Sequence, residues 1–265
     1  MRVLVTGLRG TVGRALEPAL HAAGHEVIGW DRSVAPATDL AACDAYVRQI
    51  NPRGIIHLAV ASNPTGVASE GRAVSVDWSM VLARYALELR LPFVFTSTVM
   101  VFTDDAPGPF ETTSVPDAAE GYGGEKAEAE RLIRQTYDDA VIARLGWQIG
   151  TAPGSNNMID FLHRQMAEHG VVRASTNWTP ACAHLADTAE ALVWCLSAPV
   201  STYMLEGNRA GHSFYEIASA LGARHDGAFT VEPADEPARD QRMLDDRVPM
   251  KQLDESLAGL GATTA

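Results

Sequence analysis

Short apolar segments alternate with longer helical segments through the first half of the chain, and no other feature constrains the fold as strongly. We expect strands over five segments, at residues 2–6, 26–30, 54–58, 92–96 and 140–144. We expect helices between them, over residues 11–23, 39–50, 68–89 and 121–137. Strands that are apolar throughout are typical of a parallel sheet whose two faces are both covered. The pattern therefore predicts an α/β fold with a doubly wound parallel sheet of Rossmann type.

Glycines punctuate the junction between the first strand and the first helix, in the pattern G-x-x-G-x-x-G. Glycines here allow a tight turn, a close backbone approach to a pyrophosphate and close packing of the helix on the strand. The free N–H groups of the first helical turn then point at phosphate oxygens. A purely structural turn is the alternative. The residues that we assign to a dinucleotide here are Gly7, Arg9, Gly10, Thr11, Val12 and Gly13.

The end of the second strand carries two residues that select between dinucleotides. Asp31 can accept hydrogen bonds from the ribose diol of an adenosine, which favours NAD. Arg32 follows directly, and its guanidinium suits a 2′-phosphate, which favours NADP. The Asp-Arg pair therefore leaves the choice between NAD and NADP open.

The regular alternation weakens after residue 146. We expect helices over residues 156–169, 184–197, 213–222 and about 250–260, and a mostly exposed segment over 232–255. The chain thus divides into a dinucleotide-binding domain over 1–150 and a smaller, mainly substrate-binding part over 151–265. Some return of the chain to the first domain is expected.

Composition limits the classes of partner. The chain has 265 residues, a net charge of -12 and no basic run. Such a chain is a poor candidate for binding nucleic acid or an anionic membrane. No apolar run has the length of a signal peptide or a membrane span.

Cysteine and histidine usage points the same way. The three cysteines form no Cys-x-x-Cys pair, which argues against a disulfide framework and for a reducing compartment. The eight histidines are scattered without metal-binding spacing, so we expect no metal site. We expect a cytoplasmic protein.

Three residues in order form a candidate catalytic group. Tyr122 and Lys126 lie one helical turn apart, and Thr98 ends the fourth expected strand. A tyrosine can donate a proton to a developing alkoxide, but its ordinary pKa is about 10. A nearby ammonium lowers that pKa, so we expect Lys126 to activate Tyr122 and Thr98 to hold the substrate oxygen.

Taken together, these motifs resemble the extended short-chain dehydrogenase/reductase superfamily, and within it the dTDP-4-dehydrorhamnose reductase group. Phe95-Thr96-Ser97-Thr98 resembles the strand end that carries the family's catalytic hydroxyl, which implies Thr98 in that role. The resemblance implies further cofactor contacts at Asp39, Leu40, Leu58, Ala59 and Val60. We also expect Tyr122 and Lys126 to contact the cofactor, with Lys126 holding the nicotinamide ribose. It implies substrate contacts at Thr98, Val99, Trp147, Asn157 and Trp178.

The chain departs from this family on the substrate side. Val99 and Met100 replace the family's Asp and Tyr, and Ser175-Thr176 replaces an acidic-Gln pair. The Asn that supports an active-site water in the family is Ser75 by spacing. These changes bear on the substrate and leave the residues for hydride chemistry in place.

The resemblance implies an NAD(P)H-dependent reductase of a ketone on a nucleotide-linked deoxysugar or a related polyol, working by a Tyr/Lys/Thr mechanism. A sugar epimerase that holds NAD tightly is one alternative, and a non-catalytic dinucleotide-binding regulatory subunit is another. A dehydratase is disfavoured because Val99 and Met100 have no titratable group. The expected partner is a small molecule, and homodimers through surface helices are common in this superfamily.

Overall fold

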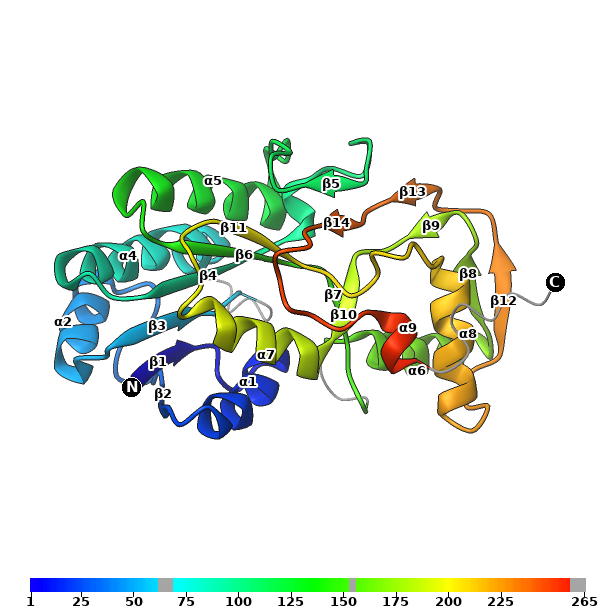
Figure 1. The fold of residues 1–265 in the computed structure, drawn as a ribbon, viewed down its shortest axis with the longest axis horizontal. Coiled ribbons are helices and arrows are strands. Elements are labelled where there is room, and N and C mark those ends of the chain that lie inside the picture. The colour runs from blue at the N-terminus through cyan, green and yellow to red at the C-terminus, as the bar shows by residue number, and fades with distance from the viewer. Residues whose placement is uncertain (62–68, 153–155, 258–265) are drawn as a thin grey trace. The chain divides into compact units, whose positions relative to one another are not determined.

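A computed structural model describes residues 1–61, 69–152 and 156–257, shown as a ribbon in Figure 1. By their contacts these residues form two compact units. Unit 1 comprises Met1–Thr103, Val115–Arg144 and Ala189–Tyr203. Unit 2 comprises Asp104–Ser114, Leu145–Thr188 and the residues from Met204 onward. The chain therefore passes between the units several times.

A six-stranded sheet forms the centre of unit 1, in the order β11-β6-β4-β3-β1-β2. The pairings of β1 with β2, β1 with β3, and β3 with β4 are parallel. The chain places β2 on one side of β1 and β3 on the other, so a topological switch point lies between β1 and β3. Ligands of open α/β sheets bind at the carboxyl ends of strands at such a point. The strands are β1 (Arg2–Thr6), β2 (Glu26–Gly29), β3 (Gly54–His57), β4 (Phe93–Thr98), β6 (Val141–Leu145) and β11 (Thr202–Leu205).

Helices cover both faces of this sheet. Figure 1 shows α2, α4 and α5 on one face and α1 and α7 on the other. Large buried side chains such as Trp78, Phe93 and Phe95 fill the layer beneath α4 and α5. The predicted doubly wound fold is therefore confirmed. The helices are α1 (Thr11–Ala22), α2 (Leu40–Ile50), α3 (Glu70–Arg72), α4 (Trp78–Leu89), α5 (Gly121–Thr136) and α7 (Leu185–Cys195), with a π-helical turn η1 (Ala73–Asp77) and a 3₁₀ turn η2 (Val99–Val101).

Unit 2 is built from short parallel strand pairs and three helices. The pairs are β7 with β10, β8 with β12, β9 with β13, and β5 with β14. Its core contains Ile149, Met158, Leu162, Phe214 and Leu221. The elements are β5 (Phe110–Glu111), β7 (Trp147–Ile149), α6 (Met158–His169), β8 (Val172–Ser175), β9 (Trp178–Thr179), β10 (Cys182–His184), α8 (Phe214–Arg224), β12 (Val231–Ala234), β13 (Arg239–Asp240), β14 (Met243–Leu244) and α9 (Leu253–Ser256).

The later part of the chain differs from the sequence expectation. The helices expected at 156–169, 184–197 and 213–222 are confirmed as α6, α7 and α8. The strands after residue 146 were missed, because runs of two to four residues are too short to show a period. The segment 232–255 was expected to be mostly exposed, and most of its residues are exposed or half-buried. Met243 of β14, which pairs with β5, and Val248 are buried.

Two helix predictions also need adjustment. The helix expected over 68–89 contains the π-helical turn η1, so it is not one regular α-helix. Residue 68, and the end of the helix expected near 250–260, lie outside the described residues. Within the described ranges, no helix combines the length and the apolar character needed to cross a bilayer.

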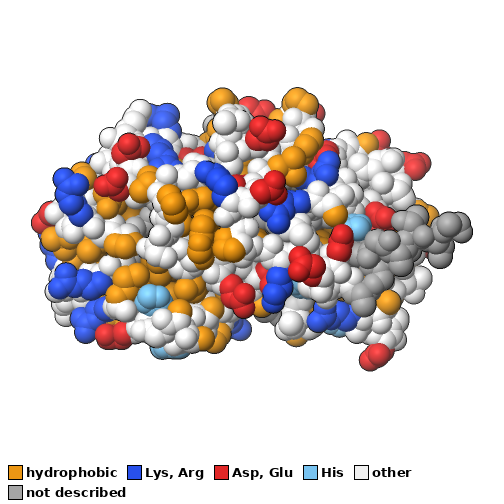
Figure 2. All heavy atoms as spheres, in the orientation of Figure 1, with side chains coloured by type: hydrophobic (Ala, Val, Ile, Leu, Met, Phe, Trp, Pro, Cys, Tyr) orange, Lys and Arg blue, Asp and Glu red, His pale blue; other side chains and the backbone are white. Residues whose placement is uncertain are grey.

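Charge is dispersed on the surface in view. On the face drawn in Figure 2, basic and acidic side chains are interspersed, with hydrophobic side chains between them. The basic side chains on this face form no cluster that would attract a polyanion.

Candidate active site

The glycine turn after β1 has the geometry of a backbone cradle. Gly7 has a positive φ of 71°, and a Cβ built on it would lie 3.1 Å from the backbone nitrogen of Ala59. The N–H of Gly10 donates to the carbonyl of Gly7 at 2.9 Å, which closes the turn. Gly10 occupies the N-cap position of α1, and no side chain accepts a hydrogen bond from the first N–H groups of this helix. An uncapped helix start behind a glycine turn fits a phosphate group.

The segment after β3 is held against this turn. The hydroxyl oxygen of Thr6 accepts the N–H groups of Leu58 at 3.1 Å and Ala59 at 3.2 Å. Ala59 is buried, and Leu58 and Val60 are half-buried. The structure therefore brings Leu58 and Ala59 to the glycine turn, at the switch point between β1 and β3.

Asp31 lies directly after β2, at the carboxyl end of the same sheet. Its Oδ1 accepts hydrogen bonds from the backbone N–H and the hydroxyl of Ser33, at 2.9 and 2.7 Å. These bonds, with a smaller contribution from Arg9, lower the pKa of Asp31 below its ordinary value. Asp31 is thus ionised at neutral pH. Arg32 follows it directly in the sequence, the charge of Arg9 acts on its carboxylate, and both arginines are exposed. The carboxylate suits the ribose diol of an adenosine and the two guanidinium groups suit a 2′-phosphate, so the choice between NAD and NADP stays open.

Asp39 and Leu40 mark the start of α2. The Asp39 carboxylate accepts the N–H of Ala42 at 3.0 Å and so caps this helix. Leu40 is 40% exposed. A cap of this kind explains Asp39 without a ligand, and the predicted adenine contact stays a prediction.

Thr98 is the last residue of β4 and lies 8% exposed. Its Oγ1 accepts the N–H of Met100 at 3.2 Å, at the start of the 3₁₀ turn η2. Because the oxygen is already an acceptor, its own hydrogen remains to be donated. The side chain is therefore suited to donate to a carbonyl oxygen. Val99 follows in η2 and is buried.

The 3₁₀ turn and the start of α5 are in direct backbone contact. A Cβ built on Gly123 would lie only 1.9 Å from the carbonyl oxygen of Met100. Only glycine allows this approach. The contact holds the turn after Thr98 against the first turn of α5, which carries Tyr122 and Lys126.

Lys126 points into the protein. It is completely buried, and its Nζ donates to the carbonyl of Thr96 at 2.8 Å. The Nζ lies 4.4 Å from the ring centroid of Phe95 and 5.9 Å from that of Tyr122. Burial lowers the pKa of Lys126 to about 7. The group is therefore close to half protonated at neutral pH.

Tyr122 differs from the sequence expectation. Burial, followed by the charge of Glu125, raises the pKa of Tyr122 to about 12, whereas we expected Lys126 to lower it. The physical reason is that burial disfavours the phenolate, while the Nζ of Lys126 bonds to the backbone carbonyl of Thr96. Tyr122 as a whole residue is 37% exposed, although its phenol is buried enough to raise its pKa.

A buried ion pair lies behind this group, and sequence reasoning missed Glu130. Arg144 donates to both carboxylate oxygens of Glu130, at 3.0 and 2.7 Å, and the two side chains are 5% and 7% exposed. The guanidinium also lies 5.1 Å from the ring centroid of Phe102. The signal in the sequence was an acidic residue one helical turn after Lys126 on the buried face of α5.

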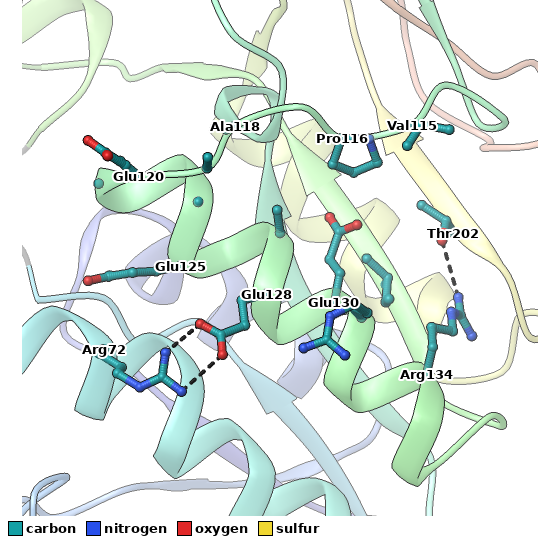
Figure 3. Close-up of a pocket in the computed structure, with 16 residues that line it drawn as sticks. Arg72, Val115, Pro116, Ala118, Glu120, Glu125, Glu128, Glu130, Arg134 and Thr202 are labelled. Atoms are coloured by element: carbon teal, nitrogen blue, oxygen red, sulfur yellow. Dashed lines mark hydrogen bonds and ion pairs between the residues drawn. The ribbon is translucent and has the colours of Figure 1, made fainter.

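A pocket of about 710 Å³ opens on the outer side of α5 in unit 1, as Figure 3 shows. Glu128 on its wall is paired with Arg72, and Arg134 donates to Thr202. Glu130 reaches this pocket from α5, but Tyr122 and Lys126 do not line it. Arg72 and Glu128 pair with each other, Glu130 pairs with Arg144, and the pocket lacks Thr98, Tyr122 and Lys126, so it is a less convincing reaction site than the strand end at Thr98.

In unit 2, the two tryptophans predicted to contact substrate lie together. The rings of Trp147 and Trp178 are stacked with centroids 6.1 Å apart, and both contact Phe214. Trp178 also donates its Nε1–H to Gln241 at 2.8 Å and carries the Arg239 guanidinium 5.2 Å from its centroid. Both residues are half-buried.

The side chain of Asn157, the third predicted substrate contact in unit 2, forms hydrogen bonds with backbone groups. Its Oδ1 accepts the N–H of Asp160 at 3.1 Å and caps α6, and its Nδ2 donates to the carbonyl of Ala152 at 3.2 Å. The residue is 2% exposed. Its predicted role toward substrate stays a prediction. Among the described residues, no cluster of three His, Cys, Asp or Glu side chains is arranged to hold a metal ion.

Comparison with known proteins places this chain in a family. The family model described as "RmlD substrate binding domain" matches residues 1–242. A dTDP-4-dehydrorhamnose reductase of Mycobacterium tuberculosis is 25% identical over 217 residues, which cover 79% of this chain and 70% of that protein. The resemblance to the dTDP-4-dehydrorhamnose reductase group is therefore confirmed.

Two further matches show the range of these relatives. A dTDP-4-dehydrorhamnose reductase from Bacillus anthracis, solved in complex with NADP, superposes with a TM-score of 0.82 at 19% identity, covering 97% of this chain and 96% of that one. The methionine adenosyltransferase 2 subunit beta of Xenopus tropicalis is 30% identical over 154 residues, which cover 54% of this chain and 46% of that protein. The fold is thus shared with a reductase and part of the sequence with a subunit of another enzyme.

Proposed function

This chain belongs to the RmlD substrate binding domain family, and from that premise we propose that it is an NAD(P)H-dependent reductase. Its substrate is a ketone on a nucleotide-linked deoxysugar or a related polyol. The names of its reductase relatives support the oxidoreductase class and the sugar-nucleotide substrate.

One observation carries the proposal. The hydroxyl of Thr98, with its hydrogen left to donate, sits on a turn that touches the backbone of α5 at Gly123. Tyr122 precedes Gly123 directly and is 37% exposed as a residue, and Lys126 lies one turn further on. A hydrogen-bond donor, a proton donor and a cation are the groups that ketone reduction requires.

The roles of these residues follow from their chemistry. Bound NAD(P)H supplies the hydride that reduces the carbonyl carbon. Thr98 donates a hydrogen bond to the carbonyl oxygen, and Tyr122 gives its phenolic proton to the alkoxide. The ammonium of Lys126 stabilises the phenolate that Tyr122 leaves behind. The cradle of Gly7 and the uncapped start of α1 hold the pyrophosphate.

The substrate side of the proposal is less like the named relatives. Val99 and Met100 place apolar side chains after Thr98, and Met100 is 53% exposed. We therefore propose a substrate with an apolar group near its carbonyl, such as the methyl of a 6-deoxysugar. The contacts assigned to Trp147, Asn157 and Trp178 remain part of this proposal.

A second candidate function is a non-catalytic subunit that binds a dinucleotide. The observation that favours it is the similarity to a protein named as a subunit of methionine adenosyltransferase. The presence of Thr98, Tyr122 and Lys126 favours the reductase, because a binding subunit has no need of a proton donor.

The test begins with binding titrations of NADH and NADPH. Oxidation of the bound form is then followed by nicotinamide absorbance against nucleotide-linked 4-ketosugars and free ketoses. Turnover of one class supports the reductase and identifies its substrate. Tight binding without turnover across the whole panel favours the subunit.

Substitution of the proton donor sharpens the test. Tyr122→Phe should lower kcat by about a hundredfold or more, because general acid catalysis contributes roughly 10²–10⁴-fold. The affinity for the cofactor should change little. Tyr46→Phe removes a phenol from α2 instead and serves as the matched control. Unchanged turnover in Tyr122→Phe would remove Tyr122 from the mechanism.

A further inference from the structure

Lys126 has an unusual electrostatic position for a lysine. Its side chain is completely buried, and its Nζ donates to a neutral acceptor, the carbonyl of Thr96. An ammonium taken out of water loses its hydration, and a nearby countercharge offsets the free-energy cost. The charge of Lys126 therefore depends on anions held within the protein.

Glu130 is placed to supply that anion. It follows Lys126 by one turn of α5, so the two side chains emerge on the same side of the helix. Arg144 of β6 clamps both of its carboxylate oxygens, and the pair is nearly inaccessible to solvent. A carboxylate fixed in this way cannot rotate toward water, and its field is weakly screened.

We propose that Glu130, held in place by Arg144, is a positioning residue that keeps Lys126 protonated and so lets Tyr122 work as a proton donor near neutral pH. The link to Lys126 stands on the geometry of the buried pair. The link to Tyr122 rests on the proposed reductase function.

The other groups around Lys126 do not replace Glu130. On β3, the imidazole of His57 stays neutral, because burial followed by the charge of Lys126 lowers its pKa to about 3. On β4, the neighbours are the Thr96 carbonyl and the Phe95 ring. On β6, Arg144 is engaged with Glu130.

Two more carboxylates lie on α5 itself. Glu125 also favours the charged form of Lys126, but it ranks after Glu130 in that effect. Glu128 is paired with Arg72 at the wall of the outer pocket (Figure 3). Burial lowers the pKa of Lys126 to about 7 even with these anions present. Loss of the Glu130 charge should lower it further, which removes the ammonium at neutral pH.

The composition of the chain makes a direct test practical. The 265 residues include two lysines, Lys126 and Lys251. Protein labelled with ¹³C-lysine therefore gives two side-chain Cε signals, and Lys251, whose side chain is 62% exposed, is an internal reference. The midpoint of the Lys126 signal against pH reports its protonation without any need for turnover.

Four variants separate the charge of Glu130 from its structural role. Glu130→Gln removes the charge, and Glu130→Asp keeps it. Glu128→Gln is the matched control, since it removes a carboxylate from the same helix. Glu130→Gln combined with Arg144→Gln removes both partners, so that no buried charge is left alone if the single variant folds poorly.

We expect the Lys126 midpoint to fall by about 1 pH unit or more in Glu130→Gln and in the double variant. It should change little in Glu128→Gln and recover in Glu130→Asp. An unchanged midpoint in both the single and the double variant overturns the proposal.

The pH profile of ketone reduction tests the second link. The alkaline limb of kcat/KM should move to lower pH in Glu130→Gln and in the double variant, because the reaction needs the ammonium. The contrary result is that Glu130→Gln lowers kcat/KM equally at every pH, with the alkaline limb unmoved, while the double variant regains wild-type activity. That result would indicate a structural role for Glu130 and contradict the proposal. If no ketone is turned over at all, the reductase assignment fails, while the lysine titration still decides the role of Glu130.

Discussion

Glu130 and Glu206 are both buried, and the groups that surround the two carboxylates differ. Glu130 in unit 1 accepts two hydrogen bonds from the guanidinium of Arg144. Glu206 in unit 2 is 1% exposed and accepts the backbone N–H groups of Cys182, Asn208 and Met243, at 3.0, 2.7 and 3.1 Å. Backbone dipoles offset burial less completely than a full positive charge does.

The pKa of Glu206 leads to a prediction about stability. Burial raises this pKa from 4.5 to about 8. Between those two values the folded state binds more protons than the unfolded state, so stability falls as pH rises through this window. The slope from one group is at most about 1.4 kcal/mol per pH unit. Glu206→Gln should therefore flatten the pH dependence of the unfolding free energy between about pH 5 and pH 8, measured by urea titration.

Glu232→Gln, which changes an exposed residue of β12, is the control for this measurement. It should keep the slope of the wild-type protein. A slope that is equally steep in Glu206→Gln would show that Glu206 does not carry the proton.

Among the elements, α5 holds most of the proposed chemistry. Its 16 residues carry Tyr122, Lys126 and Glu130 at successive turns, and its first turn packs on the strand end at Thr98 through Gly123. A helix is stiff, so its register sets all of these positions together. A change at the contact with Met100 should therefore be felt along the whole site.

Gly123→Ala tests this coupling. The added methyl cannot fit 1.9 Å from a backbone carbonyl, so the start of α5 or the turn η2 must move. We expect a loss of stability of roughly 1–3 kcal/mol and a fall in kcat larger than any change in cofactor affinity. Urea unfolding and steady-state kinetics measure the two effects.

Gly54→Ala is the matched substitution, because its Cβ would meet only side-chain atoms at 3.4 Å or more. It should retain activity. Wild-type kinetics in Gly123→Ala would mean that the contact does not position Tyr122.

At the scale of the whole molecule, the proposed cofactor site lies in unit 1 while stacked tryptophans lie in unit 2. A ligand that binds the folded state stabilises it by mass action. At a hundred times its dissociation constant, the preferred dinucleotide should add about 2.7 kcal/mol. Thermal unfolding with NADH and with NADPH should therefore give a Tm shift of several degrees with at least one of them.

Gly7→Ala should abolish this shift, because its φ of 71° and its approach to Ala59 exclude a side chain. The dinucleotide that gives the larger shift in the native protein identifies the cofactor that Asp31, Arg9 and Arg32 select. The absence of a shift with either dinucleotide would contradict the cofactor site.

Sequence by itself determined the α/β class, five of the six strands in the sheet of unit 1, and the order of the candidate site residues along the chain. The strand at Arg2–Thr6 and the helices that follow depend on apolar runs and glycine positions, which are properties of neighbouring residues. For the same reason Thr98 was expected at a strand end and Lys126 one turn after Tyr122.

Only the tertiary structure decided what surrounds those residues. The clamp of Arg144 on Glu130 joins positions 14 residues apart across a helix and a strand, and the short ladder of β8 with β12 joins residues farther apart still. The raised pKa of Tyr122 and the lowered pKa of Lys126 follow from burial by distant segments. Local pattern sets where a helix or strand forms, whereas dielectric and ion pairing depend on which segments pack against it after folding.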